Sequence, residues 1–235
     1  KLAEQLNDIG GGLNKAVEEG MRNERLKTDL ITNVSHDIKT PLTSIINYVD
    51  ILKRENIQDP KIRGYLDILE AKAQRLKTLT EDVVEASKVS SGNIVLEYMD
   101  VDLSEMIQQT EGEFAEKFTA RNLSVVVNLP EKPAVIHVDG RRMWRVLENI
   151  FGNAAKYAMP GTRVYADLGV DEESVSFSLK NVSEQQLNIS ADELTERFIR
   201  GDISRSTEGS GLGLSIAKSL TEMQGGRFEL YLDGD

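Results

Sequence analysis

The chain has 235 residues, of which 39 are acidic and 28 basic, and its formal net charge is −11. This length is sufficient for one large domain or two small ones, and the acidic balance argues against a nucleic-acid-binding protein, which needs a basic surface. The absence of cysteine excludes disulfides and thiolate metal sites, and a count of only two histidines argues against a zinc site.

No apolar run reaches the roughly 18 residues that a membrane-spanning helix needs, and the residues after Lys1 do not form a signal peptide. We therefore expect the sequence as given to be soluble. Because it starts mid-pattern on Lys1 and stops on Asp233-Gly234-Asp235, we also expect it to be a piece of a longer protein. Residues 1–22 favour a polar connector helix with a flexible joint at Gly10–Gly12, because each glycine costs about 1 kcal/mol of helix stability. A disordered end is the alternative interpretation.

The apolar periodicity of residues 23–90 predicts two helices, the first ending near Arg54 and the second running from Lys61 to about Val89. In the first helix the expected buried stripe consists of Ile31, Val34, Ile38, Ile45, Val49 and Leu52. At about 100° per residue, His36 lies roughly 160° from Val34 and from Ile38, so its imidazole should point away from the stripe. An outward imidazole beside the carboxylate of Asp37 is a candidate reactive group.

A heptad pattern runs along the second helix, through Ile62, Leu66, Leu69, Ala73, Leu76, Thr80 and Val83. Such a seam is suited to close packing between long helices. Two amphipathic helices cannot cover both of their apolar faces, so a homodimer that forms a four-helix bundle is the simplest solution. Packing of this helical hairpin on the rest of the chain is the alternative.

The pattern changes after residue 90. Residues 91–100 are interpreted as a linker and a first strand, and residues 101–235 as a second domain with Asp139 as a helix cap. The expected strands are 94–101, 123–129, 134–138, 164–168, 175–179 and 227–232, and the expected helices are 103–120, 140–158, 191–198 and 210–224. This mixture predicts an α+β sandwich, with one sheet covered by helices.

Two stretches of the second domain suggest binding of an anion. Glycines at 209, 211 and 213 lie at the start of a predicted helix, where uncovered backbone N–H groups can hold phosphate oxygens. Asn149 and Asn153 share one helix face, and a carboxamide oxygen suits a Mg²⁺ ion that bridges phosphates. Lys156 adds a positive charge and Tyr157 an aromatic face, although an ordinary surface helix is also compatible with these residues.

Together these stretches resemble the sensor histidine kinases of two-component systems. Residues 35–42, Ser-His-Asp-Ile-Lys-Thr-Pro-Leu, are similar to the family's H box, and residues 149–157 to its N box. Glu196-Arg197-Phe198 resembles the F box, and residues 209–214 the second glycine box. The resemblance spans nearly the whole chain. It implies a dimeric helical hairpin followed by an α/β sandwich ATP-binding domain of the histidine kinase and gyrase type.

The resemblance also implies roles for individual residues. His36 would accept the γ-phosphoryl group of ATP, Asp37 would hold the imidazole tautomer and accept a proton, and Thr40 would position water for phosphatase activity. Asn153 would contact Mg²⁺. The remaining nucleotide contacts would come from Asn149, Lys156, Tyr157, Asn181, Gly209, Gly211, Leu212 and Gly213.

One motif of the family is altered. An Asp-x-Gly-x-Gly stretch is expected after the predicted hairpin strand, but Asn181-Val182-Ser183-Glu184-Gln185 stands there. The Asn181 carbonyl can still accept from the adenine amino group. A neutral acceptor forfeits about 1 kcal/mol of a charge-assisted bond.

By the same resemblance, the phosphoryl group would pass to an aspartate of a response-regulator receiver domain. The chain would be the cytoplasmic portion of a membrane-anchored bacterial sensor, with its sensor region upstream. A non-catalytic, nucleotide-switched dimeric scaffold and a gyrase-type ATPase are the alternatives. No nucleic-acid partner is expected.

Overall fold

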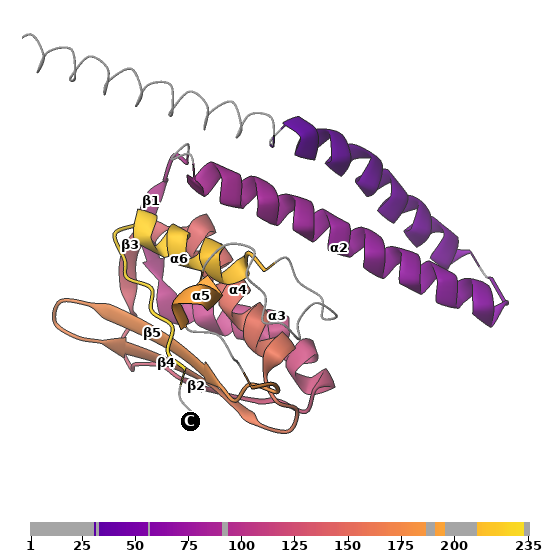
Figure 1. The fold of residues 1–235 in the computed structure, drawn as a ribbon. Coiled ribbons are helices and arrows are strands. Elements are labelled where there is room, and N and C mark those ends of the chain that lie inside the picture. Colours follow the sequence, from indigo (N-terminus) through magenta and orange to yellow (C-terminus); the bar gives the residue numbers. More distant parts are fainter. Residues whose placement is uncertain are drawn as a thin grey trace, which may run out of the picture. The chain divides into compact units, whose positions relative to one another are not determined.

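The computed structural model of the protein describes residues 31, 33–55, 57–90, 94–186, 191–195 and 211–232. The chain divides into two compact units, Lys1–Ile94 and Val95–Asp235 (Figure 1). The predicted connector at 1–22 lies outside the described residues, as do the F-box residues 196–198 and Gly209. No helix in the described part of the chain is long and apolar enough to cross a membrane.

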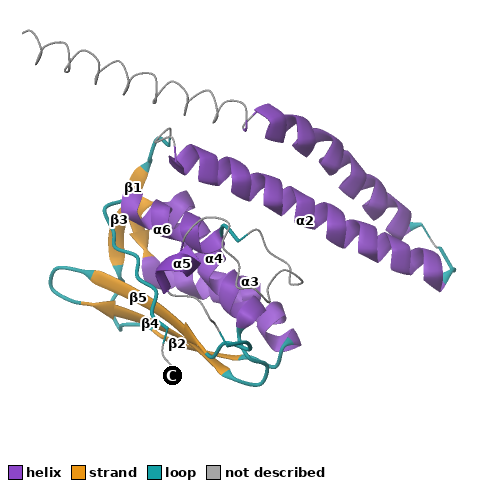
Figure 2. Cartoon of the chain, in the orientation of Figure 1, coloured by secondary structure: helices purple, strands orange, loops and turns teal. Residues whose placement is uncertain are grey.

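The first unit is a helical hairpin, as predicted. Its first helix, here called the His36 helix, covers residues 33–54, and its second helix is α2 (Pro60–Ser90). The two helices run side by side (Figure 2). Near the loop, the Lys53 ammonium lies 2.8 Å from Asp67 Oδ1 and 2.7 Å from Glu70 Oε2 of α2. Hydrogen bonds to these two carboxylates raise the pKa of Lys53 well above its ordinary value.

The predicted buried stripe of the His36 helix was largely wrong for a single chain. Ser35, Leu42 and Val49, seven residues apart, are the buried positions, whereas Val34 and Ile45 remain about half exposed. The reason is geometric, because one partner helix covers only one line of side chains along its neighbour. The neighbouring apolar line is therefore left uncovered within one chain.

The second unit is an α/β sandwich in which helices cover one face of a sheet (Figure 2). Its helices are α3 (Leu103–Ala120), α4 (Gly140–Tyr157), α5 (Ala191–Thr195) and α6 (Gly213–Met223). Its strands are β1 (Tyr98–Asp102), β2 (Ser124–Asn128), β3 (Val135–Asp139), β4 (Arg163–Val170) and β5 (Val175–Asn181). β1 pairs antiparallel with β3, while β4 lies between a parallel β2 and an antiparallel β5.

An aromatic cluster fills the space between the helices and the three-stranded sheet. Phe151 of α4 is fully buried, and its ring centroid lies 6.1–6.4 Å from those of Phe114, Phe118 and Phe177. Rings at these separations make favourable stacked and edge contacts in addition to the area that they bury. One face of α4 is thereby fixed to the core, which leaves its opposite face for polar residues.

Two predicted strands differ from the structure. The strand expected at 94–101 begins only at Tyr98, because its partner strand ends at Asp139, which pairs with Tyr98 and then starts α4. The strand expected at 227–232 is absent from the described residues. Alternation alone does not make a strand, because a strand also needs a neighbour for its backbone hydrogen bonds, and none of the described strands pairs with 227–232.

Asp139 joins three parts of the second unit. Its carboxylate accepts the Arg142 N–H at the start of α4 and the Glu97 N–H before β1, both at 3.1 Å. Its own N–H donates to the side-chain oxygen of Gln224, which ends α6, at 2.8 Å. Burial by itself would raise the pKa of Asp139, but the N–H groups of Glu97 and Arg142 outweigh it and lower that pKa below its ordinary value.

Replacing Asp139 with alanine should lower the free energy of unfolding by about 2 kcal/mol at pH 7, since a helix cap and a second N–H partner are lost together. The folded-state pKa is depressed, so this stability is present above the unfolded pKa near 3.8 and is lost as the pH falls through the folded value. Urea unfolding of both proteins at pH 7 and at pH 3 measures the difference. Asp102→Ala is the matched control, because Asp102 caps α3 through the Ser104 N–H alone. An equal loss in both variants would contradict the role given to Asp139.

Candidate active site

His36 is displayed on the surface of the hairpin, as its position relative to Val34 and Ile38 predicts. Its side chain is 81% exposed and that of Asp37 is 85% exposed. The imidazole Nδ1 lies 3.7 Å from Asp37 Oδ1, which is longer than a hydrogen bond but within the range of an ion pair. The carboxylate therefore faces Nδ1, and Nε2 is the ring nitrogen turned away from it.

Two threonine hydroxyls donate to backbone carbonyls close to Pro41, which has no N–H of its own. The Thr40 hydroxyl donates to the His36 carbonyl at 3.3 Å, and the Thr43 hydroxyl donates to the Lys39 carbonyl at 2.8 Å. Proline removes one intrahelical bond, but the helix continues through it from residue 33 to residue 54. Thr40 lies one turn beyond His36, and its hydroxyl is held at the His36 backbone carbonyl.

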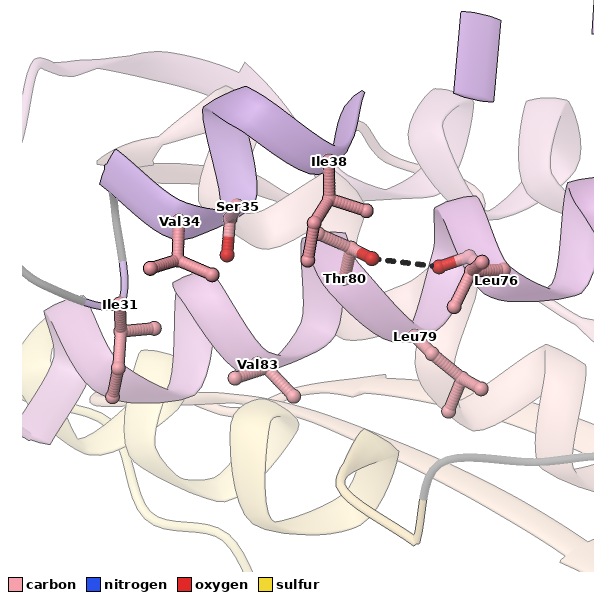
Figure 3. Close-up of a pocket in the computed structure, with 8 residues that line it drawn as sticks. All are labelled: Ile31, Val34, Ser35, Ile38, Leu76, Leu79, Thr80 and Val83. Carbon is pink, nitrogen blue, oxygen red and sulfur yellow. Dashed lines mark hydrogen bonds between the residues drawn. The ribbon is translucent and has the colours of Figure 1, made fainter. Parts of the chain in front are cut away.

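The inner side of the same turn borders an apolar groove of about 400 Å³ between the His36 helix and α2. Val34, Ser35 and Ile38 point towards α2 in Figure 3. The opposite wall comes from α2, where the Thr80 hydroxyl donates to the Leu76 carbonyl at 2.8 Å. The turn thus has an apolar inner side and a polar outer side, which keeps His36 out of the packing.

On α4, the predicted residues form a polar face opposite the aromatic core. The Asn149 amide donates to the Arg145 carbonyl at 2.9 Å, which directs its oxygen away from its own helix. Asn153 lies on the same face and makes no side-chain hydrogen bond with another described residue. The Lys156 ammonium lies 5.0 Å from the centre of the Tyr157 ring.

The glycine turn before α6 meets this face of α4. Gly211 has a φ of 73°, a left-handed conformation that glycine adopts at low cost, and α6 begins at Gly213. A Cβ atom on Gly213 would lie 3.1 Å from Asn149 Oδ1, so the helix start and the asparagine are in close contact. The predicted ligand Leu212 is fully buried, so its side chain belongs to the core and only its backbone can face a ligand.

The start of α6 has no side-chain cap from its own N-cap residue. Its N-cap residue is Leu212, whose side chain makes no capping hydrogen bond. Such uncapped N–H groups, together with the helix dipole, favour a bound anion. The structure therefore brings together the asparagine face of α4 and the glycine turn, while Gly209 lies outside the described residues.

Asn181, the residue in the altered motif, ends β5 and is exposed. The backbone that follows it is tied to the end of α4: the Met159 N–H donates to the Val182 carbonyl at 2.8 Å, and the Glu184 N–H donates to the Tyr157 carbonyl at 2.9 Å. These bonds place the Asn181 segment beside Tyr157.

Arg121 also contacts this end of α4, and the sequence did not single it out. Its guanidinium donates to the carbonyls of Ala155 and Lys156 and forms an ion pair with Glu184. These partners are 34 to 63 residues away in the sequence, so no local pattern reveals the contact.

Among the described residues, no group of three or more His, Cys, Asp or Glu side chains could hold a metal ion.

Two family models match the chain. Residues 26–92 match the His Kinase A (phospho-acceptor) domain, and residues 138–233 match the histidine kinase-, DNA gyrase B- and HSP90-like ATPases. Together the two matches cover more than two thirds of the 235 residues.

Several curated proteins are similar to the chain. The sensor protein VanSC of Enterococcus gallinarum is 34% identical over 96% of this chain and 64% of its own length. The sensor protein VanS of Enterococcus faecium is 32% identical over 96% of this chain and 59% of its own length. The chain therefore spans less than two thirds of these relatives.

Solved structures share the fold. Full-length ShkA in complex with AMPPNP superimposes with a TM-score of 0.68 at 22% identity, covering 84% of this chain and 41% of ShkA. The Acinetobacter baumannii histidine kinase AdeS gives a TM-score of 0.52 at 18% identity, covering 80% of this chain and 86% of AdeS. At these identities the likeness concerns the fold alone.

Replacing Gly213 with alanine should reduce the free energy of unfolding by about 1 kcal/mol, because the added methyl group crowds Asn149 Oδ1. In an Asn149→Ala background the same change should stabilise by about 0.5–1 kcal/mol, since only the helix preference of alanine remains. Urea unfolding of the four proteins of this cycle provides the measurement. Gly112→Ala in α3 is the control: no atom lies within 4 Å of its Cβ position, so it should stabilise in either background. Additive effects of the two substitutions would show that Asn149 and Gly213 are not coupled.

Proposed function

The chain belongs to the sensor histidine kinases of two-component systems, and on that premise we propose that it transfers the γ-phosphoryl group of ATP to its own His36. The observation that carries the proposal is the exposure of His36 beside Asp37 on a helix whose other face is packed. A nucleophile must be reachable from solvent, and phosphoryl transfer depends mainly on positioning and charge neutralisation.

The geometry of the pair suggests how each group would act. With a proton on Nδ1, the lone pair of His36 Nε2 would attack the γ-phosphorus, forming an N–P bond as the bond to the β,γ-bridging oxygen breaks and ADP leaves. The Nδ1 proton would pass to Asp37, whose Oδ1 needs to approach by less than 1 Å from its 3.7 Å position to make a hydrogen bond. Asp37 would thus set the tautomer and act as the general base.

The second unit would hold the nucleotide between α4 and the start of α6. Gly209, Gly211, Leu212 and Gly213 would direct backbone N–H groups at the phosphates, and Lys156 would add a positive charge. Tyr157 would lie beside the base, and the Asn181 oxygen would accept from its amino group. The Asn149 carboxamide lies next to Gly213 and would therefore be close to the same phosphates.

Asn153 fits a role in holding Mg²⁺. Its carboxamide has no hydrogen-bond partner among the described residues, and a neutral oxygen ligand suits an ion that keeps most of its waters. When bound, Mg²⁺ would neutralise charge on the phosphates. Asn153 would orient the ion from the face of α4 that also carries Asn149.

We further propose that two copies of the hairpin form a four-helix bundle. Leu66 and Ala73 of the predicted seam are buried within one chain, whereas Ile62, Leu69 and Leu76 are about half exposed. The alternate seam positions would pack on a second copy, together with the exposed Val34, Ile38 and Ile45 of the His36 helix.

The phosphorylated His36 would then donate its phosphoryl group to an aspartate of a response-regulator receiver domain. Thr40, fixed one turn away by its bond to the His36 carbonyl, would position water for removal of the phosphoryl group from that regulator. The chain would form the cytoplasmic part of a membrane-anchored bacterial sensor, with residues 1–22 as the connector to an upstream sensor region.

Incubation with γ-labelled ATP and Mg²⁺ tests the phosphoacceptor. The chain should acquire label that is stable to base and labile to acid, and His36→Asn should remove it completely because asparagine lacks the nucleophilic nitrogen. His137→Asn is the matched control, since His137 is the second histidine and lies in β3, where it pairs with Asp100. If the wild-type chain binds ATP but acquires no label, the kinase assignment is refuted and a nucleotide-switched scaffold is favoured.

Replacing Leu69 with glutamate tests the dimer. Each dimer would lose two buried leucines and acquire two desolvated carboxylates, which should weaken association by more than about a hundredfold. Light scattering after size-exclusion chromatography should give the mass of two chains for the wild type and of one chain for the variant. Gln74→Glu adds the same charge at an exposed position of α2 off the seam, and should remain dimeric. A monomeric wild type would overturn the proposed bundle.

A further inference from the structure

At the end of α4, each of the last four backbone carbonyls accepts a hydrogen bond. The carbonyls of a final helical turn have no partner within the helix and need one from elsewhere. Here the Ala154 carbonyl accepts from the Ala158 N–H at 3.0 Å, and the Tyr157 carbonyl accepts from the Glu184 N–H at 2.9 Å. The two carbonyls between them, of Ala155 and Lys156, both accept from one Nη1 atom of Arg121.

Arg121 reaches these carbonyls from the turn after α3. Its side chain is 25% exposed, and its Nη2 forms an ion pair with Glu184 while Nη1 contacts the helix end, at 3.2 Å from the Ala155 oxygen. A guanidinium is planar and carries several donors in a fixed fork, so it can bind three oxygens from two segments at once. Its positive charge also complements the negative end of the α4 dipole.

The contact connects two segments that the proposed nucleotide site uses. One is the last turn of α4, which carries Lys156 and Tyr157 and directly follows Asn153. The other is the segment at the end of β5, which begins at Asn181 and includes Glu184. Arg121 therefore adds a side-chain link to the two backbone hydrogen bonds that already join these segments at the base end of the site.

We infer that Arg121 and Glu184 are positioning residues for the nucleotide, an inference that rests on the proposed function. Through its ion pair with Arg121, Glu184 ties the altered segment at 181–185 to the last turn of α4. Neither residue would touch the reacting phosphate. Their effect would therefore fall on the binding of the nucleotide and not on the rate of phosphoryl transfer once it is bound.

The test uses the full chain with Arg121→Gln, Arg121→Lys, Glu184→Gln and the Arg121→Gln/Glu184→Gln double variant. Calorimetric titration with ADP and Mg²⁺ gives the dissociation constant and the binding stoichiometry, and autophosphorylation gives KM for ATP and kcat. Arg227→Gln is the control, because Arg227 is 82% exposed and pairs with Glu229 two residues away. It should leave all four quantities unchanged.

Arg121→Gln should raise the dissociation constant and KM about tenfold, since two charge-assisted carbonyl contacts are lost, with kcat at saturating ATP unchanged. Glu184→Gln should raise them about threefold, because the carbonyl contacts remain. The two effects should not add in the double variant, since Glu184 acts through Arg121. Arg121→Lys should fall between wild type and Arg121→Gln, because an ammonium cannot span three oxygens in a plane.

A purely structural role predicts a different result. Destabilised protein would show a reduced binding stoichiometry and a reduced kcat in proportion, with the dissociation constant of the folded fraction unchanged. That outcome, or equal dissociation constants for wild type and Arg121→Gln, would overturn the inference and leave the proposed function intact. A wild-type chain that binds neither ADP nor ATP would overturn the proposed function as well. If Arg121→Gln fails to fold, Glu184→Gln decides the question alone.

Discussion

The second unit depends on a single helix that must serve two environments. One face of α4 is fixed in the core through Phe151, whose ring lies among three other phenylalanines, and the opposite face carries Asn149 and Asn153. Each end is fastened by a charged side chain, Asp139 at the start and Arg121 at the end. A polar face can hold a ligand in a defined geometry only if its helix cannot shift, and burial together with two capped ends supplies that rigidity.

In the hairpin, by contrast, one chain leaves part of its apolar surface uncovered. Heptad spacing places the apolar residues of each helix on two neighbouring lines. Within one chain, the facing helix covers only one of these two lines. The same geometry keeps His36 clear of packing: the turn that buries Ser35 directs the next residue outward. Exposure of the imidazole is thus a consequence of how the helix packs.

The altered motif at 181–185 illustrates how a fold can tolerate the loss of a sequence feature. Glycines at this point would allow the backbone to move freely, whereas Ser183, Glu184 and Gln185 make side-chain and backbone contacts that restrict it. The segment is bonded to Tyr157 and Met159 through the backbone and to Arg121 through Glu184. A stiffer segment and a neutral Asn181 change how a nucleotide base would be held without changing the chemistry available at His36.

The sequence by itself determined the elements and the reactive groups. Apolar periodicity located α2, α3, α4 and the β4–β5 hairpin, Asp139 was identified as a cap, and His36 was identified as outward because angular spacing on a helix is a local property. Only the tertiary structure decided which apolar line of the hairpin is covered, where β1 and the C-terminal segment stop pairing, and that Arg121 closes the end of α4. Those outcomes depend on partners far away in the sequence, and hydrogen-bond partners of that kind leave no periodic signal in the residues that make them.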